Sequence, residues 1–305
     1  MLPVRRIAVC TALLALILTG CGGKPGCDSI RGRSGPNCVD IAILTVIPAE
    51  YFALIGKLRV DRVAPPCPHC VNRYGWVYAE LDSPRHAKPY RIVIGMAGEA
   101  GTTAGALAAQ HALARFRPRH LLLVGVAGGL PDRLRQGDVV LSESIWAYDY
   151  GAVDEWFRPR QDFTFRADPQ LLAAAIAVPE GWQEDIESEA PDPSRIPALR
   201  SGQIGSGNKV IEFIGSRFAD SVLEANSQIV GVEMEGAGAA AAVEEAHIEG
   251  HQVGFLMIRG ISDVPQDIGV LRDKKDRERW KRYAADAAAS YTLRLIRDQW
   301  PDPPR

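Results

Sequence analysis

The stretch Val-Gly-Val-Glu-Met-Glu-Gly-Ala-Gly, residues 230–238, decides the fold because two carboxylates join an apolar run to an Ala-rich run. Residues 229–232 predict a buried strand, and the run after Glu235 predicts a helix. Alternation along a strand would point Glu233 and Glu235 to the same side, with Met234 opposite. Both carboxylates would then lie at the carboxyl end of a strand, where ligands bind in open α/β sheets.

A purely structural role for Glu235 is open at this point. The helix dipole stabilises a carboxylate at a helix N-terminus, so Glu235 on its own fits a helix cap as well as a ligand site. Other predicted strand ends favour a site. Residues 121–126 lead into Gly128 and Gly129, where missing side chains let a ligand approach the backbone, although a tight turn needs the same glycines.

Two further strand ends carry acids. The apolar run at residues 253–258 leads to Ser262 and Asp263. Glu50 opens a predicted helix soon after the first predicted strand. Because the carboxyl ends of parallel strands meet at one edge of a sheet, we expect these acids to share a site with Glu235.

The chain has 305 residues, 47% of them hydrophobic, which allows one large α/β domain or two small ones. Strand and helix patterns alternate, which predicts one sheet covered by helices on both faces. The predicted strands are residues 41–46, 91–96, 121–126, 139–142, 229–232 and 253–258, and the predicted helices are residues 104–116, 236–247 and 276–300. Residues 179–197, rich in Pro, Glu and Asp, are interpreted as a surface loop or insertion and as a candidate cover for a site.

Residues 1–20 have the layout of a secretory signal, in which a basic start precedes an apolar run that is too short to span a bilayer comfortably. The end of this segment, Leu-Thr-Gly-Cys21, resembles the lipobox of bacterial lipoproteins; the alternative is an ordinary cleaved signal. A lipid on Cys21 would anchor the protein to a membrane of the bacterial cell envelope, on its periplasmic or extracellular face. Residues 21–38 would form the tether.

Export would place the chain in an oxidising compartment, where cysteines form disulfides. With one cysteine lost in the signal and another acylated, two disulfides are expected among Cys27, Cys38, Cys67 and Cys70, with a pairing that the spacing leaves open. The alternative for Cys67-Pro-His-Cys70 is half of a zinc site or a redox pair. Because no second C-x-x-C and no metal-spaced His pair follows, structural disulfides are favoured over a zinc site. No metal and no cofactor are expected.

Short motifs stand at the predicted strand ends, in the order Ile43-x6-Glu50, Gly125-Val-Ala-Gly-Gly-Leu130, Ser206-Gly-Asn208, Val232-Glu-Met-Glu-Gly236 and Arg259-Gly-Ile-Ser-Asp263. This order resembles the nucleoside phosphorylase/nucleosidase superfamily, closest in pattern to methylthioadenosine/S-adenosylhomocysteine nucleosidases. The resemblance covers about residues 39–300, with residues 301–305 as a tail. It implies a single-domain, three-layer α/β sandwich, in which a central mixed, largely parallel twisted sheet is flanked by helices, and it implies a homo-oligomer.

The resemblance also implies a role for each acid. Asp263 matches the acid that protonates purine N7 and so makes the base a neutral leaving group, with Ser262 orienting it. Glu235 matches the carboxylate that accepts hydrogen bonds from the ribose 2′- and 3′-hydroxyls. Glu50 matches the general base that prepares the attacking water.

The same resemblance implies a set of substrate-binding residues. Met234 would pack on the sugar, with Glu233 in the same pocket. The backbone of Val210 and Ile211 would meet the edge of the base. The binding set is completed by Gly128, Gly129 and Arg259.

The chemistry of the reaction supports this assignment independently. Cleavage of an N-glycosidic bond builds positive charge on the ribosyl ring and negative charge on the departing base, so it needs anions near the sugar and a proton donor near the base. A phosphorylase would need cations and hydroxyls around an anion pocket. The glycine-rich turn at residues 98–103 instead carries Glu99, which would repel phosphate, and Glu50 supplies a base that only water needs.

We therefore expect hydrolysis of the N-glycosidic bond of a purine nucleoside, of the adenosine or 5′-thioadenosine type, to free base and ribose moiety. The alternatives are a purine nucleoside phosphorylase and a non-catalytic nucleoside-binding lipoprotein. Val126 and Val210 replace a small hydroxyl residue and an aromatic ring of the family pattern, which leaves the base and the 5′ group open. A formal net charge of −2 gives no long-range reason to expect nucleic acid as a partner.

Overall fold

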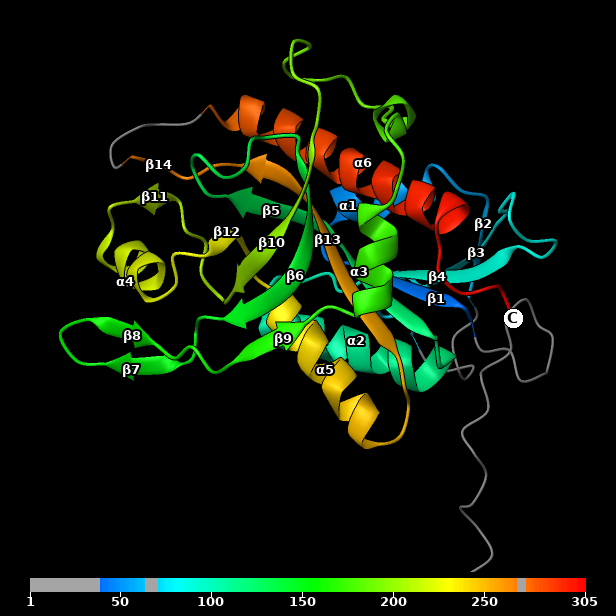
Figure 1. Cartoon of the computed structure of the whole chain (residues 1–305), viewed down its shortest axis with the longest axis horizontal. Helices are drawn as coiled ribbons and strands as arrows, with labels where there is room; N and C mark the ends of the chain where they lie inside the picture. The colour runs from blue at the N-terminus through cyan, green and yellow to red at the C-terminus, as the bar shows by residue number, and fades with distance from the viewer. Residues whose placement is uncertain (1–38, 64–70, 268–272) are drawn as a thin grey trace, which may run out of the picture.

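A central sheet with helices on both faces forms the fold in the computed structural model, which describes residues 39–63, 71–267 and 273–305 (Figure 1). The predicted signal peptide, the lipidation site Cys21, the tether and the disulfide candidates Cys27, Cys38, Cys67 and Cys70 lie outside the described residues. No helix within the described residues is long and apolar enough to cross a membrane.

Ten of the described strands form one sheet in the order β12-β10-β6-β13-β5-β1-β4-β3-β2, with β9 paired to β6. Their bounds are β1 (Ile41–Thr45), β2 (Val60–Arg62), β3 (Val77–Leu81), β4 (Tyr90–Met96), β5 (His120–Gly129), β6 (Val139–Ala147), β9 (Thr164–Arg166), β10 (Leu199–Ser206), β12 (Ile229–Glu233) and β13 (Gly254–Asp263). Two small sheets pair β7 (Gly151–Val153) with β8 (Phe157–Pro159) and β11 (Phe213–Ile214) with β14 (Gln266–Asp267).

The sheet is mixed, as expected, and one part of it closes on itself. β4, β1, β5 and β13 run parallel, as do β6, β10 and β12, whereas β13 and β6 are antiparallel. β12 also pairs antiparallel with β5, through Gly231 with Gly129 and Val232 with Gly128. β5, β13, β6, β10 and β12 therefore form a barrel-like ring, which the sequence did not predict.

The alternation of side chains along the strands separates the two helical layers. Ala42 and Leu44 belong to the core cluster that includes α2 and α5, whereas Ile41 and Ile43 belong to the cluster that includes α1 and α6. Both clusters are apolar, which explains why the central strands read as continuous hydrophobic runs. The helices are α1 (Pro48–Ile55), α2 (Thr102–Phe116), α3 (Pro169–Ile176), α4 (Arg217–Ala225), α5 (Gly236–Ile248) and α6 (Lys274–Asp298).

Helices α2 and α5 pack with their backbones in close approach, which explains why both are rich in small residues. A Cβ atom at Gly238 would lie 1.7 Å from the carbonyl oxygen of Thr102. This contact joins the first turn of α5 to the first turn of α2. It also brings the loop before α2 against the glutamates that precede α5.

The segment at residues 179–197 does not cover the pocket described below, contrary to the interpretation of it as a site cover. It contains a 3-10 helix, η1 (Trp182–Asp185), and it packs on α6. The Arg294 Nε donates to Asp185 Oδ2 at 2.8 Å, and the amide of Ser188 donates to Asp286 Oδ2 at 2.6 Å. These bonds hold the segment against α6, on the other side of the sheet from α2 and α5.

Residues 301–305, expected to form a tail, contact the domain. The backbone N–H of Arg305 donates to Asp40 Oδ1 at 2.9 Å, and the Tyr90 hydroxyl donates to the carbonyl of Asp302 at 2.7 Å. His120 Nε2 lies 3.0 Å from Asp302 Oδ2. The buried Asp40 carboxylate thus receives a partner from the last residue of the chain.

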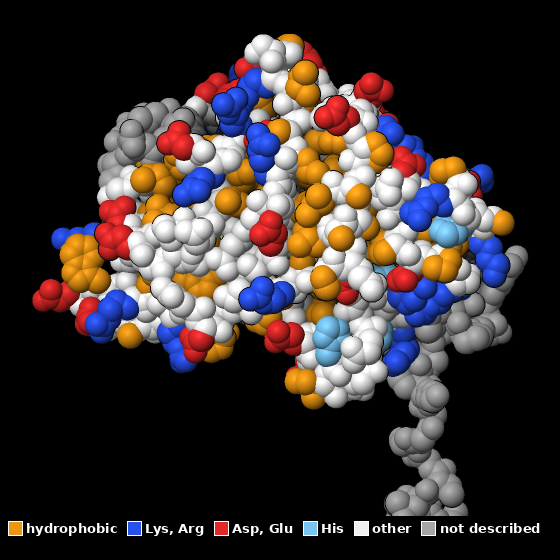
Figure 2. Space-filling model, viewed as in Figure 1, with side chains coloured by type: hydrophobic (Ala, Val, Ile, Leu, Met, Phe, Trp, Pro, Cys, Tyr) orange, Lys and Arg blue, Asp and Glu red, His pale blue; other side chains and the backbone are white. Residues whose placement is uncertain are grey.

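Charged side chains are interspersed on the face shown in Figure 2. Lys and Arg side chains alternate there with Asp and Glu side chains, and apolar patches lie between them. This face carries no continuous basic surface of the kind that tracks a nucleic-acid backbone.

Candidate active site

A pocket of about 310 Å³ lies at the carboxyl ends of β1, β5, β12 and β13. This volume is within the range of small-molecule sites. Its wall includes the predicted acids Glu50, Glu233, Glu235 and Asp263, which come from three separate strand ends. These acids therefore share one cavity, as their positions at strand ends predict.

Glu50 stands in the first turn of α1, where its carboxylate is buried and held by backbone amides. Oε2 accepts hydrogen bonds from the amides of Val46 at 2.7 Å and Ile47 at 3.0 Å, and Oε1 accepts one from Val126 at 2.8 Å. Burial raises the pKa of Glu50 above its ordinary value, while Arg259 and these three amides favour the ionised form. The carboxylate is therefore fixed in direction and is a stronger base than a solvated glutamate.

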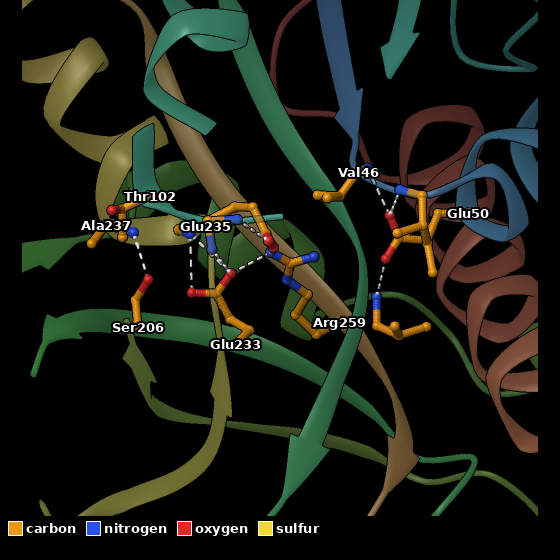
Figure 3. Close-up of polar contacts among 12 residues, drawn as sticks. Val46, Glu50, Thr102, Ser206, Glu233, Glu235, Ala237 and Arg259 are labelled. Atoms are coloured by element: carbon orange, nitrogen blue, oxygen red, sulfur yellow. Dashed lines mark hydrogen bonds and ion pairs between the residues drawn. The ribbon is translucent and has the colours of Figure 1, made fainter. Parts of the chain in front are cut away.

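Glu233 is the residue that caps α5. Its carboxylate accepts hydrogen bonds from the amides of Glu235 at 2.9 Å and Gly236 at 3.0 Å and 2.9 Å, and it forms an ion pair with Arg259. Ser206 Oγ accepts from the next amide, that of Ala237, at 2.9 Å (Figure 3). The cap role that the sequence left open for Glu235 thus belongs to Glu233, whose side chain borders the pocket but is almost fully engaged.

Glu235 makes no cap bond and is free for another role. β12 ends at Glu233, so the predicted alternation does not extend to Glu235, which begins the helical turn. Its Oε1 accepts from the amide of Gly101 at 2.9 Å, and Arg259 Nη2 donates to its Oε2 at 3.2 Å. Burial raises the pKa of Glu235 to about 7; Arg259 opposes this rise and the carboxylate of Glu233 adds to it.

Arg259 lies behind the pocket, between the Glu233–Glu235 pair and Glu50 (Figure 3). Its side chain is fully buried and is absent from the pocket wall, which corrects the expectation that it contacts substrate. Burial lowers the pKa of the guanidinium, but the carboxylates of Glu233, Glu235 and Glu50 prevail and raise it. A buried charge needs paired partners, and this cation lets three buried glutamates coexist.

Gly125 on β5 makes room for this arrangement. A Cβ atom there would lie 2.4 Å from Arg259 Nη1 and 2.4 Å from Glu50 Oε1. Both charged groups therefore approach the strand over a position that only glycine fills. Gly125 thus lets Glu50 and Arg259 pack against β5.

Asp263 is the last residue of β13; it is half-buried and lines the pocket. Ser262 Oγ donates to its Oδ1 at 2.8 Å, as the predicted orienting role requires. Its Oδ2 lies 3.7 Å from where a Cβ atom at Gly128 would be, so the missing side chain at Gly128 leaves space in front of the acid. Gly128 lines the pocket as predicted.

Gly129, in contrast, does not line the pocket. A Cβ atom there would lie 2.8 Å from Leu134 and 2.9 Å from Ile261, and the residue pairs with Gly231 where the ring closes. Its role is packing at the junction of β5 and β12, which corrects its assignment to substrate binding. The other predicted contacts Val210, Ile211, Met234 and Ser262 do line the pocket.

Sequence reasoning missed the charged residues that complete the pocket wall. They are Lys209, next to the predicted base-edge segment, and Arg277, Glu278 and Lys281 of α6. The α6 helix was predicted from its buried stripe, which does not indicate what its exposed first turns face. The charge run Asp-Lys-Lys-Asp-Arg-Glu-Arg at residues 273–279 was the available signal.

The cavity combines three acids: Asp263, which has open space in front of it, Glu50, which backbone amides hold in place, and the buried Glu235. Such an arrangement stabilises a positive charge and donates or accepts protons on either side of it. The residues at 39–63, 71–267 and 273–305 contain no group of three or more His, Cys, Asp or Glu that could hold a metal ion.

Known proteins resemble this chain over most of its length. A family model described as "Phosphorylase superfamily" matches residues 41–297. A 5′-methylthioadenosine/S-adenosylhomocysteine nucleosidase from Mycobacterium bovis is 28% identical over 85% of this chain and 97% of its own length. The ATP nucleosidase Cap17 from Escherichia coli is 24% identical over 85% of this chain, which spans only 51% of that protein.

A solved structure supports the fold. The 5′-methylthioadenosine/S-adenosylhomocysteine nucleosidase from Neisseria meningitidis, in complex with methylthio-immucillin-A, superposes with a TM-score of 0.63 at 20% identity. The match covers 85% of this chain and 98% of that chain. The expected architecture, a single α/β domain with a central sheet flanked by helices, is therefore confirmed.

Proposed function

Because the chain belongs to the phosphorylase superfamily, we propose that it is a nucleosidase that hydrolyses the N-glycosidic bond of a purine nucleoside of the adenosine or 5′-thioadenosine type. One observation carries the proposal. Glu50, Glu235 and Asp263 come from three separate strand ends and line a single pocket. The relatives named as nucleosidases act on bonds of this kind, which supports the same reaction here.

In the proposed reaction the bond between C1′ and the base nitrogen breaks, and its electron pair leaves with the base. Asp263 donates a proton to purine N7, so the base departs neutral. Glu235 accepts hydrogen bonds from the ribose hydroxyls and stabilises the positive charge on the ring. Water adds to C1′ and transfers its proton to Glu50, whose carboxylate three backbone amides hold in place.

The occupied amides of the glycine-rich turn favour water over phosphate as the nucleophile. The amide of Gly101 donates to Glu235, and the amide of Thr102 donates to Asn208 Oδ1 at 2.9 Å. A phosphate site would need such donors free. Glu99, which was expected to repel phosphate, is exposed and lies outside the pocket wall, so the engaged amides, and not Glu99, favour hydrolysis.

A base-release assay tests this proposal. Purified protein is incubated with adenosine, inosine, guanosine and methylthioadenosine, with and without inorganic phosphate, and free base is measured by chromatography. We expect base release from at least one adenine nucleoside at the same rate in both buffers. Release that requires phosphate would identify a phosphorylase, and nucleoside binding without any release would indicate a binding protein; either result contradicts the proposal.

A further inference from the structure

Two cationic side chains of α6 form part of the wall of the catalytic pocket. Arg277 and Lys281 stand one helical turn apart, and both line the cavity that contains Glu235 and Asp263. Their side chains are 43% and 32% exposed, so they remain in contact with solvent at the mouth. A neutral nucleoside gives neither of them a partner.

Lys209, the third cation of the wall, is already neutralised. Its Nζ lies 2.6 Å from Asp149 Oδ1, and Asp149 also accepts hydrogen bonds from the amide and side chain of Asn208. These bonds hold the pKa of the Asp149 carboxyl below its ordinary value, in spite of its partial burial. Lys209 therefore has a fixed structural partner and is set aside.

The partners of Arg277 and Lys281 are more exposed than Asp149. Arg277 Nη1 reaches Glu212 Oε1 only at 4.0 Å. Lys281 Nζ pairs at 2.8 Å with Glu278, a half-exposed carboxylate that also lines the pocket, so an anionic ligand would take Lys281 in competition with Glu278. Exposed pairs of this kind contribute little to stability.

We propose that the pocket takes a purine nucleoside that carries an anionic 5′-phosphate group, and that Arg277 and Lys281 bind this group. The inference rests on the proposed function, in which Asp263 takes the base, Glu235 the 2′- and 3′-hydroxyls and Glu50 the water at C1′. The 5′ substituent is the one part of the substrate left without a partner. The α6 wall supplies the charge that a phosphate requires.

Base release from adenosine and from AMP, ADP and ATP tests this inference. We expect a kcat/KM for at least one of these nucleotides that is at least about tenfold above that for adenosine, as two partly exposed ion pairs would give. The double variant Arg277→Gln/Lys281→Gln should lower the nucleotide-to-adenosine ratio by a similar factor. The matched control is Arg279→Gln/Arg282→Gln, on exposed positions of the same helix that do not line the pocket, and it should keep the wild-type ratio.

Calorimetric binding of AMP and adenosine to the Asp263→Asn variant separates this inference from the proposed function. Tighter binding of AMP, weakened by added salt, supports the inference even if no base is released from any substrate. Equal affinity and equal kcat/KM for the two ligands would overturn it while leaving nucleoside hydrolysis intact. A ratio that stays unchanged in Arg277→Gln/Lys281→Gln would also overturn the assignment of these side chains.

Discussion

Asp263→Asn should lower kcat for base release by about 100- to 10,000-fold, the range that a general acid contributes. Asparagine keeps the shape of the side chain and can still accept a hydrogen bond from Ser262, which lies 2.8 Å from Asp263 Oδ1. It cannot give a proton to purine N7, so the base must leave as an anion. The measurement is base release under saturating substrate.

The Asp263→Asn variant should remain folded, because the residue is half-buried at the end of β13 rather than in the core. Its melting temperature should stay close to the wild-type value. The matched control is Asp82→Asn, an exposed aspartate after β3, which should keep wild-type activity. A wild-type rate in Asp263→Asn would show that the leaving base takes its proton elsewhere.

Glu235→Gln should show a second large effect, a loss of activity together with a gain of stability at alkaline pH. The neutral amide cannot stabilise the positive ribosyl ring, so we expect kcat/KM to fall by about 100-fold or more. In the wild-type protein kcat/KM should fall as the pH drops through about 7, the pKa of Glu235, because the protonated carboxyl loses the same interaction. A pH profile of the two proteins measures both effects.

The stability effect follows from the sign of the pKa shift. The pKa of Glu235 rises from 4.5 to about 7 on folding, so the folded state holds this proton more tightly than the unfolded state. The resulting stabilisation is present below about pH 4.5 and is lost as the pH rises to about 7, up to about 3 kcal/mol. Glutamine mimics the protonated carboxyl and should remove this loss.

The free energy of unfolding of Glu235→Gln relative to wild type should therefore increase between pH 5 and pH 8. Glu244→Gln, an exposed position on the same helix, is the matched control and should show no such change. If the difference between Glu235→Gln and wild type is constant with pH, burial of the Glu235 carboxylate does not strain the fold. The fall of kcat/KM near pH 7 could then not be assigned to Glu235.

The position of the acids could be predicted because it depends on local patterns. Apolar runs that end in Glu235 and Asp263 identify strand ends, and parallel strands bring their carboxyl ends to one edge. Glu50 was placed by the same reasoning, since it follows the first strand directly. Those features require only the periodicity of the sequence and the rule for ligand sites in α/β sheets.

It could not be predicted in this way that Glu233 caps α5 and that Glu235 does not. It depends on where β12 ends, because one residue of strand more or less turns the amides of Glu235 and Gly236 toward or away from Glu233. The burial of Arg259 behind them is a long-range contact that the pattern of β13 does not reveal. The sequence shows an arginine within an apolar strand, but it does not show which carboxylates neutralise it.

Contacts between distant segments account for the remaining differences. The antiparallel pairing of β5 with β12 closes the ring through Gly129 and Gly231, and Gly-rich segments specify strand register only weakly. The first turns of α6 line the pocket although they are distant in sequence from most of its other residues. Their side chains, Arg277 and Lys281, resemble any solvated helix surface until the tertiary structure places them beside the acids.

The central claim is that acids from three strand ends form one cavity, which cleaves the N-glycosidic bond with water. Hydrolysis in water enriched in oxygen-18 tests this claim most directly. The wild-type protein should release free base and an equal amount of ribose moiety carrying one labelled oxygen at C1′, in buffer without phosphate. Glu50→Gln should reduce labelled product by about 100-fold or more, since water loses its base. Unlabelled sugar, a sugar phosphate, or undiminished labelling in Glu50→Gln would contradict the account.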